Sequence, residues 1–294
     1  MFKRKSSLNK FDYFNYIFLI LISCITIYPF IYVLAGSFNQ GTDYMNGGVY
    51  LFPRVFSLDN YKMIFNDNRL YIGFKNTIAR TLIGTPAGVF FTAMVSYGMS
   101  RKDLKFKKQI YWFNLFTLFF SGGLIPYFLV LKTLSLNNSF WVYIVPNLYS
   151  VFNMIIFANY FREIPEEIHE SAVVDGAREF TIFWKLYLPL SKPVLATIAL
   201  WVGVFHWNSF FDSMLFTTDP KLQTLQLFLV KLIKEASLGQ GQANIRVPAH
   251  VMSTISITTV RYAAIVVSSI PIFMLYPFVQ KYLVKGVMLG SVKG

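Results

Sequence analysis

The chain has 294 residues, of which 55% are hydrophobic and only 14% are charged. A soluble globular domain carries about 25% charged residues, so this composition excludes an ordinary soluble domain and indicates a membrane protein. The formal net charge of +13 would suggest a nucleic-acid-binding protein if the basic residues were not arranged around apolar segments.

Six long uncharged runs predict six membrane-spanning helices. A helix needs about 20 mostly apolar residues to cross the hydrocarbon core of a bilayer, and none of the runs shows the alternation expected of strands in a membrane barrel. The expected fold class is therefore all-α, a polytopic membrane protein with six transmembrane helices. In chain order the expected spans are 13–36, 73–99, 109–131, 139–161, 193–215 and 257–280.

The basic residues predict which side of the membrane each loop faces. With the N-terminus inside, the inner segments hold sixteen Lys and Arg residues and the outer segments hold eight. The loop 100–109, SRKDLKFKKQ, contributes five of the sixteen. Because basic residues concentrate on the cytoplasmic side, both termini (1–12 and 281–294) are expected in the cytoplasm of a multi-pass cell-membrane protein. The basic excess therefore reflects topology and does not indicate nucleic acid.

Two of the expected spans contain residues that are unusual at membrane depth. Arg80 lies inside the second span, and the sequence SGGLIPY interrupts the third with Gly122, Gly123 and Pro126. Ionisable residues inside spans usually mark a functional path, and irregular backbone is tolerated there only where protein or water covers it. The break is therefore expected to line a cavity. The alternative interpretation is a structural kink packed on a neighbouring helix.

The segment 162–192 interrupts the apolar chain with an acidic and polar stretch that the topology places inside. Glu166 and Glu167 suit the positive end of a helix dipole, and Gly176 is a typical residue just past a helix end. A second short helix is expected to follow, to pack an apolar face of Phe180, Phe183 and Trp184 on the spans, and to stop at Pro189. The segment is therefore predicted to form a helix, a tight turn and a second helix beneath the membrane.

The same segment carries a specific pattern: Glu170-Ser171-Ala172, then Gly176 after three residues, then nine residues to Leu186-Tyr187-Leu188-Pro189. It resembles the coupling loop of binding-protein-dependent ABC importer permeases, whose pattern is Glu-Ala-Ala, Gly and Ile-x-Leu-Pro at the same spacing; Ser171 and Leu186 are conservative departures. The stretches LFPRVFSLDNYKMIF, WNSFFD and QKYLVKGVMLGSVKG resemble the carbohydrate branch of that family, in particular the second permease of a maltose-type pair.

This resemblance implies a permease subunit of an ATP-driven oligosaccharide importer, in one transmembrane domain over 1–294 with a six-span core at 13–280. It implies as partners a second homologous permease in a heterodimer, a cytoplasmic ATPase dimer, an extracytoplasmic solute-binding protein and membrane lipid. It also implies that segment 162–192, here called the coupling loop, docks on the ATPase and that the C-terminal tail reaches it. The residues expected to couple to the ATPase are Glu170, Ser171, Ala172, Asp175, Gly176, Ala177, Phe180, Leu188, Pro189, Lys285, Lys293 and Gly294.

The substrate path is expected among polar, aromatic and helix-breaking residues of the spans. Arg80 and Arg261 both approach from the outer side, so they could form a cationic wall for an acidic oligosaccharide; the alternative is that they snorkel to the interface. Aromatic rings stack on sugars and amides bond hydroxyls, although packing in the core is an equally good explanation. The full set of candidates is Arg80, Arg261, Gly122, Gly123, Pro126, His206, Trp207 and Asn208.

The chain shows no chemistry of its own for energy conversion. It contains no G-x-x-x-x-G-K-[ST] pattern, so ATP and magnesium are expected on the partner ATPase and no cofactor on this chain. Its three histidines have no metal-ligand spacing, and there is no nucleophile–base pair, so an enzyme is not expected. The alternative function is an ATP-independent secondary transporter or channel for small polar solutes, and a membrane scaffold or receptor is the third candidate. Neither alternative accounts for the coupling-loop pattern.

Overall fold

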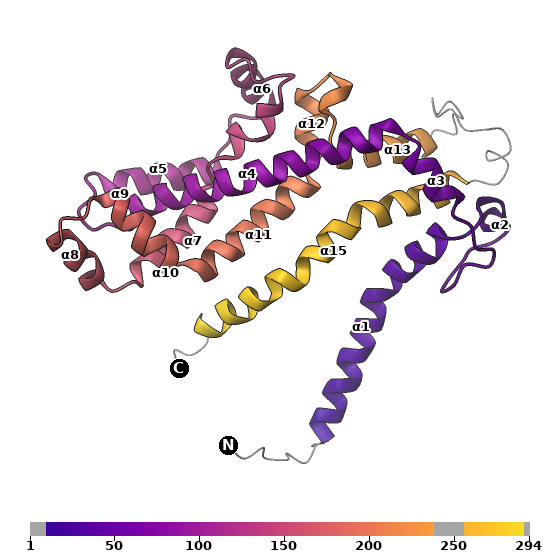
Figure 1. The fold of residues 1–294 in the computed structure, drawn as a ribbon, viewed down its shortest axis with the longest axis horizontal. Coiled ribbons are helices and arrows are strands. Elements are labelled where there is room, and N and C mark those ends of the chain that lie inside the picture. Colours follow the sequence, from indigo (N-terminus) through magenta and orange to yellow (C-terminus); the bar gives the residue numbers. More distant parts are fainter. Residues whose placement is uncertain (1–9, 238–255, 291–294) are drawn as a thin grey trace. The chain divides into compact units, whose positions relative to one another are not determined.

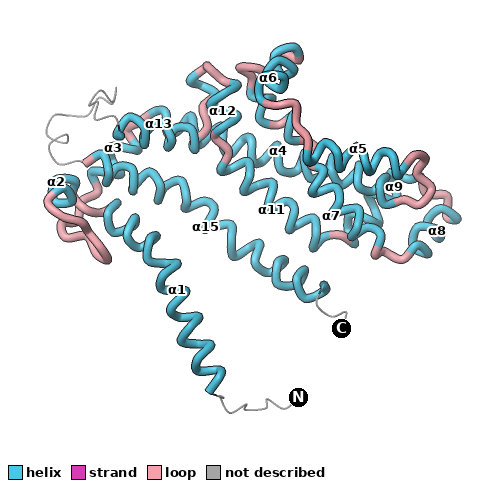
Figure 2. Tube along the Cα trace, turned by 180° about the vertical axis from the view of Figure 1, so that it is seen from behind, coloured by secondary structure: helices cyan, strands magenta, loops and turns pink. Residues whose placement is uncertain are grey.

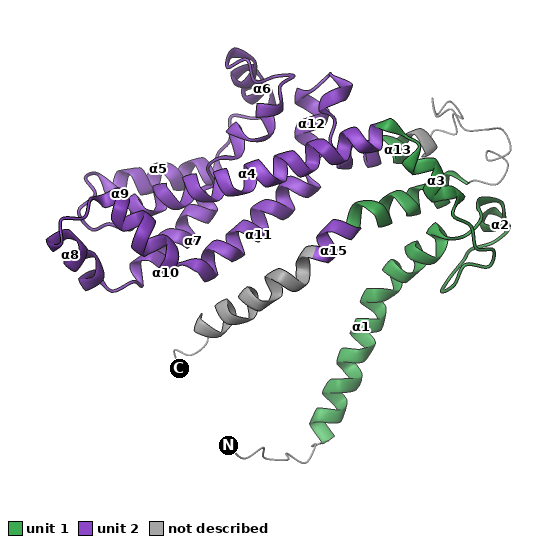
Figure 3. Cartoon of the chain, viewed as in Figure 1, with its two compact units in different colours: residues 1–68, 231–269 green, residues 69–230, 270–294 purple. Residues whose placement is uncertain are grey.

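A computed structural model describes residues 10–237 and 256–290. Within these ranges the chain is helical, with loops at the helix ends (Figure 2) and a single isolated bridge between Asn39 and Phe56 in place of any sheet. The chain divides into two compact units, residues 1–68 with 231–269 and residues 69–230 with 270–294 (Figure 3).

The first unit contains the N-terminal helix and the loop that follows it. Most large apolar side chains of α1 are exposed, as expected for a helix that faces lipid. Asn60 organises the loop: its amide nitrogen donates to the carbonyls of Ser37 and Asn39, each at 2.9 Å, and its oxygen accepts from the Thr259 hydroxyl at 2.8 Å. The helices that lie wholly in this unit are α1 (Lys10–Ser37), α2 (Gly41–Met45) and α3 (Asp59–Phe65).

The second unit is a bundle in which α4, α5, α7 and α11 run beside one another (Figure 1). Its helices are α4 (Asn68–Ser100), α5 (Lys107–Phe119), α6 (Leu124–Thr133), α7 (Val151–Arg162), α8 (Glu166–Val174), α9 (Glu179–Ile182), α10 (Leu188–Leu190), α11 (Lys192–Asn208) and α12 (Phe211–Phe216). Helices α13 (Leu225–Ser237) and α15 (Ile257–Gly290) begin in one unit and end in the other.

Small residues of α4 allow its neighbours to approach closely. A Cβ on Gly84 would lie 2.5 Å from Nε2 of His206 on α11, and a Cβ on Gly73 would lie 2.9 Å from Cα of Leu225 at the start of α13. The core of the bundle forms further along α4, where Tyr97, Phe161 and Phe183 are buried together with other residues of α7, the coupling loop and α11. The second half of the coupling loop therefore contributes buried residues to the hydrophobic core.

The helices match the six expected spans in position but not always in shape. Among the described residues, three helices are long and apolar enough to cross a membrane, and there are up to six if each bent pair counts as one span. The first, second and sixth expected spans correspond to α1, α4 and α15, and α15 remains helical through Gly290, where the sequence predicted a tail from 281.

The third and fourth spans are bent, and the chain bends sharply just before the fifth. The third is broken between α5 and α6 with a bend of 114°, the fourth by 45° between Phe140–Asn147 and Val151–Arg162, and the approach to the fifth by 85° between Glu179–Leu190 and Lys192–Asn208. The fifth span ends at Asn208, and α12 is a separate short helix. Gly123 at the N-cap of α6 has φ +86°, a conformation that suits glycine and lets the chain turn sharply.

Candidate functional site

The first half of the coupling loop is a short helix closed by a glycine turn. Helix α8 starts after Pro165 and has Glu166 and Glu167 in its first turn. At its end Gly176 has φ +81°; its N–H donates to the carbonyl of Val173 and the N–H of Ala177 donates to that of Ala172, each at 2.9 Å. This pair of bonds is the Schellman arrangement, in which a left-handed residue satisfies the last helical carbonyls.

The second half is a continuous but irregular helical segment. After α9, residues Phe183–Tyr187 form one π-helical turn, and α10 follows directly. Pro189 has no N–H to give to the carbonyl four residues back, which is one reason for the chain to leave regular α geometry here. Ser191 then lies at the 85° bend that leads into α11.

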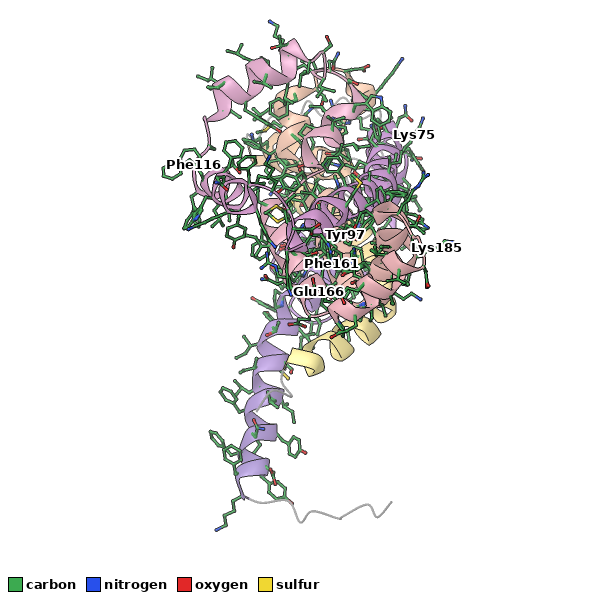
Figure 4. The ribbon with its side chains drawn as sticks, turned by 90° about the vertical axis from the view of Figure 1, so that its left-hand side faces the viewer. Lys75, Tyr97, Phe116, Phe161, Glu166 and Lys185 are labelled. Carbon is green, nitrogen blue, oxygen red and sulfur yellow. The ribbon has the colours of Figure 1, made fainter. Side chains whose placement is uncertain are left out.

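A partly buried polar contact joins the two halves to each other and to α4: His169 is buried, whereas the Glu179 side chain is 58% exposed. Nε2 of His169, on α8, lies 3.1 Å from Oε1 of Glu179 at the start of α9. The hydroxyl of Tyr97, near the end of α4, donates to the other oxygen of the same carboxylate. Figure 4 labels Tyr97 together with Phe161 and Glu166 at this end of the bundle. The sequence pattern pointed to neither Tyr97 nor His169, because residues so far apart leave no local signal.

A second connection joins the coupling loop to the turn between α4 and α5. The ammonium group of Lys102 donates to Oε2 of Glu166 in the first turn of α8. This bond holds the pKa of the Glu166 carboxylate below its ordinary value and raises the pKa of Lys102. Both side chains face solvent, so the pair orients α8 more than it stabilises the fold.

The face of the coupling loop that points away from the bundle contains most of the expected coupling residues. Ala172, Ala177 and Leu188 are half-buried, and six others are exposed: Glu170, Ser171, Asp175, Gly176, Phe180 and Pro189. We expected Phe180, Phe183 and Trp184 to pack together on the spans. Only Phe183 is buried; Phe180 and Trp184 are 60% and 54% exposed. Their rings stack on each other, so they form an apolar patch on the outside of the loop.

Three further residues expected to reach the ATPase belong to the C-terminal tail. Lys293 and Gly294 lie outside the described residues. Lys285 belongs to α15, but its side chain also lies outside the described part of the chain.

Arg80 is buried and paired with an acidic residue. Its guanidinium donates to both carboxylate oxygens of Asp212 on α12, at 3.1 and 2.5 Å, and its centre lies 4.6 Å from the ring of Tyr143. The carboxylate also accepts from the hydroxyl of Ser209 and the backbone N–H of Ser213. Arg80 is fully buried, and the Asp212 carboxylate balances its charge. An acidic sugar could bind the guanidinium directly only if this ion pair opened.

A sequence signal for this pair exists. An arginine inside a membrane span needs a partner, and Asp212 is the acidic residue that follows the fifth span. The pairing of Asp212 with Arg80 was not predicted from the sequence.

The remaining substrate candidates separate into buried and exposed residues. His206 is fully buried against Gly84, and Trp207 is buried beside Phe74, so both pack in the core of the bundle. Asn208 is exposed, and its amide oxygen accepts from Gln226. Three further candidates are exposed: Gly122 and Gly123 lie at the break before α6, and Pro126 lies in the first turn of that helix.

Arg261 belongs to the first unit. Its guanidinium donates to the carbonyl of Ile233 at 2.9 Å. This bond joins the start of α15 to the end of α13.

Comparison with known proteins gives a consistent result over nearly the whole chain. The profile of the family described as "Binding-protein-dependent transport system inner membrane component" matches residues 3–289. The chain is 38% identical over 284 residues to the polygalacturonan/rhamnogalacturonan transport system permease protein YtcP of Bacillus subtilis (strain 168), covering 97% of this chain and 98% of that protein. It is 37% identical over 288 residues to protein LplC of the same strain, covering 97% and 95%.

A solved structure agrees with these sequence matches. A chain of the crystal structure of a bacterial ABC transporter involved in the import of the acidic polysaccharide alginate superposes with a TM-score of 0.83. It is 30% identical, and the match covers 96% of this chain and 99% of that one.

Proposed function

Because this chain belongs to the family of binding-protein-dependent transport system inner membrane components, it is a permease subunit of an ABC importer, and we propose that its cargo is an oligosaccharide. Relatives named for their cargo include permeases for polygalacturonan and rhamnogalacturonan, for arabinooligosaccharides, for lactose and for sulfoquinovosyl glycerol. The single structural observation behind the mechanism is the exposed face of the coupling loop, held in place by the Gly176 turn.

We propose that this face docks on a cytoplasmic ATPase that binds ATP and magnesium. Glu170 projects from a helix whose own buried face is anchored through His169, so a force on the exposed face moves α8 as a unit. The anchor continues through Glu179 to Tyr97 on α4. From Tyr97 to Arg80 the same helix extends about 25 Å at 1.5 Å per residue. Helix α4 thus connects the anchor of the coupling loop at Tyr97 to the buried ion pair between Arg80 and Asp212 without an interruption.

We further propose an acidic cargo. Support comes from the acidic polysaccharide of the structurally similar importer and from the polygalacturonan of a close relative. It does not come from Arg80, whose charge is taken by Asp212. If Arg80 does contact a uronate, the sugar carboxylate must replace Asp212 on the guanidinium.

The remaining partners follow from the exposed apolar surface and from the basic loops. Long rows of exposed apolar side chains on α1 and α5 require lipid or a second permease subunit as neighbours. We propose a heterodimer with a homologous permease, a solute-binding protein on the outer side, and both termini in the cytoplasm.

The test reverses one charge on the proposed docking face. Glu170→Arg should abolish uptake of oligosaccharide and lower the amount of ATPase that co-purifies, while the permease still reaches the membrane. Asp103→Arg also reverses the charge of an exposed acidic residue, but outside the coupling loop, and should retain both uptake and ATPase co-purification. If Glu170→Arg leaves ATPase co-purification and uptake intact, the coupling role is wrong and the ATP-independent alternative gains support.

A further inference from the structure

Two adjoining cavities lie where the turn between α4 and α5 meets the turn between α7 and α8. One has a volume of about 430 Å³ and is lined by Lys107, Lys108, Tyr111 and Arg162. The other, of about 540 Å³, shares Lys107 and Arg162 and extends to the coupling loop at Glu166. The smaller cavity is lined by three cationic residues and Tyr111 and by no acidic residue, so its chemistry suits an anion.

Two of these cations are held in position by the backbone. The ammonium group of Lys107 donates to the carbonyls of Ser100 and Arg101, at 3.2 and 2.5 Å. The guanidinium of Arg162 donates to the carbonyl of Met99 at 3.3 Å and to the side-chain oxygen of Asn159. These bonds use two of the three donors of the lysine and two of the five of the arginine. The groups are therefore pre-positioned with donors to spare for an anionic oxygen.

The helix that carries two of the lining residues adds to the attraction. Helix α5 begins at Lys107, and the residue before it, Phe106, offers no side-chain cap. The first backbone N–H groups of a helix and its dipole favour an anion. The cavity therefore lies at the positive end of a 13-residue helix as well as among three cationic side chains.

An apolar stripe continues from the cavity along α5. Lys108, Trp112 and Phe116 follow one another at intervals of four residues, which places them on one face of the helix. Trp112 and Phe116 are 62% and 57% exposed, and Figure 4 shows Phe116 at the margin of the molecule. A free phosphate would use only the cationic end of this surface. A molecule with an anionic head and hydrocarbon chains would use both.

We infer that this cavity binds the phosphate head group of an anionic phospholipid of the inner leaflet, with its acyl chains along the Trp112 and Phe116 face of α5. Basic pockets between membrane helices on the cytoplasmic side are suited to anionic lipid head groups. The inference rests on the proposed orientation, which places the coupling loop inside. A lipid here would lie next to the larger cavity and so next to Lys102 and Glu166, the pair that orients α8.

The test measures lipid retention by the purified permease complex. The complex in detergent is titrated with phosphatidylglycerol, or with phosphatidylcholine of the same acyl chains, and bound lipid is counted by native mass spectrometry. We expect phosphatidylglycerol to bind more tightly than phosphatidylcholine. Lys108→Gln and Arg162→Gln should each weaken phosphatidylglycerol binding about fivefold, the contribution typical of one basic residue. Arg162→Lys should retain most of it.

Lys105→Gln is the matched control, because it removes the same charge from the same loop but lines neither cavity. Equal losses in Lys105→Gln and Lys108→Gln would mean diffuse attraction and would overturn the site. So would equal binding of the two lipids. If inorganic phosphate displaced phosphatidylglycerol at millimolar concentration, the cavity would be a free-anion site and not a lipid site. The readout does not involve sugar uptake, so a wrong cargo would leave it unaffected.

Discussion

Arg80 on α4 and Asp212 on α12 form a two-point ion pair inside the helix bundle, with donor–acceptor distances of 3.1 and 2.5 Å. The arginine side chain is fully buried, and that of Asp212 is 15% exposed. The aspartate also accepts bonds from Ser209 and Ser213. Because the fifth span ends before α12, this pair is a main link between that short helix and α4.

Breaking the pair from one side should be more harmful than removing both charges. Arg80→Gln or Asp212→Asn leaves one buried charge without its partner, which costs about 3–5 kcal/mol. The double variant Arg80→Gln with Asp212→Asn should recover much of this loss. Thermal unfolding of the purified complex measures all three. If instead Asp212→Asn is harmless and Arg80→Gln changes only the KM for an acidic sugar, Arg80 is a substrate contact and not a structural one.

The close contact between Gly84 and His206 predicts an asymmetry between two glycines. In Gly84→Ala the new methyl carbon would lie 2.5 Å from Nε2 of His206, and because the ring is buried, overpacking should cost about 1–3 kcal/mol. At Gly203, on the facing helix, the nearest atom to a Cβ is Oγ1 of Thr85 at 3.5 Å. Gly203→Ala should therefore be neutral or stabilising. Equal melting temperatures for the two variants would contradict the packing of α4 against α11.

The turn that closes α8 should depend on backbone conformation alone. Gly176 has φ +81°, and a Cβ there would meet no atom within 4 Å. Gly176→Ala should thus cost about 1–2 kcal/mol through its left-handed conformation and misplace the exposed face of α8, lowering uptake. Gly98 also has open space around it but lies inside α4, so Gly98→Ala should be neutral or stabilising.

Uptake measured at equal membrane levels compares these two variants. If Gly98→Ala is as harmful as Gly176→Ala, the loss comes from added bulk near the coupling loop and not from its turn.

The anchor at Tyr97 should separate ATP hydrolysis from transport. Tyr97→Phe removes the hydroxyl that donates to Glu179; because that carboxylate is 58% exposed, the bond contributes about 1 kcal/mol. The loop should still bind the ATPase but move α4 less, so ATPase activity should persist while uptake falls. Tyr160→Phe, on α7, removes a hydroxyl with no hydrogen bond to the described residues and should change neither activity. Parallel loss of both activities in Tyr97→Phe would mean that the loop has lost docking, not transmission.

Local features of this protein could be predicted from its sequence, and distant pairings could not. The turn at Gly176 could be predicted because a helix, a glycine and the two prolines Pro165 and Pro189 lie within one short segment. The break at Gly122 and Gly123 was expected, but its 114° bend was not, because glycine permits many directions and packing selects one. The partner of Arg80 lies 132 residues away.

Two aromatic residues on the surface of the coupling loop were also predicted incorrectly. Phe180 and Trp184 were expected to pack on the spans because of their apolar character. The ring of Trp184 does meet that of Phe90 on α4 edge-on, with 5.6 Å between centroids, yet both side chains are largely exposed. In a subunit of a larger assembly, apolar character does not distinguish a core residue from one that awaits a partner. Phe183, which lies between these two residues in the sequence, is buried in the core, and its burial shows which face of the second helical segment of the coupling loop points to the bundle.

The ion pair between Lys102 and Glu166 predicts how the attachment of α8 depends on pH. Lys102 holds the pKa of Glu166 below its ordinary value. A lowered carboxyl pKa contributes stability that is present above the unfolded pKa of about 4.3 and is lost as the pH falls through the folded value. Glu166→Gln should therefore lower the melting temperature slightly at pH 7, and the difference from the wild type should vanish as the medium becomes more acidic.

Lysine variants identify the source of this effect. Lys102→Gln removes the bond and should move the acid transition of Glu166 up toward the ordinary carboxyl pKa. Lys105→Gln removes a charge from the same loop but forms no bond with Glu166 and should leave the transition where it is. The acid transition of each lysine variant can be determined from melting temperatures measured between pH 7 and pH 3. If the difference between Glu166→Gln and the wild type grows as the pH falls, the sign is reversed and Lys102 does not hold α8 through this carboxylate.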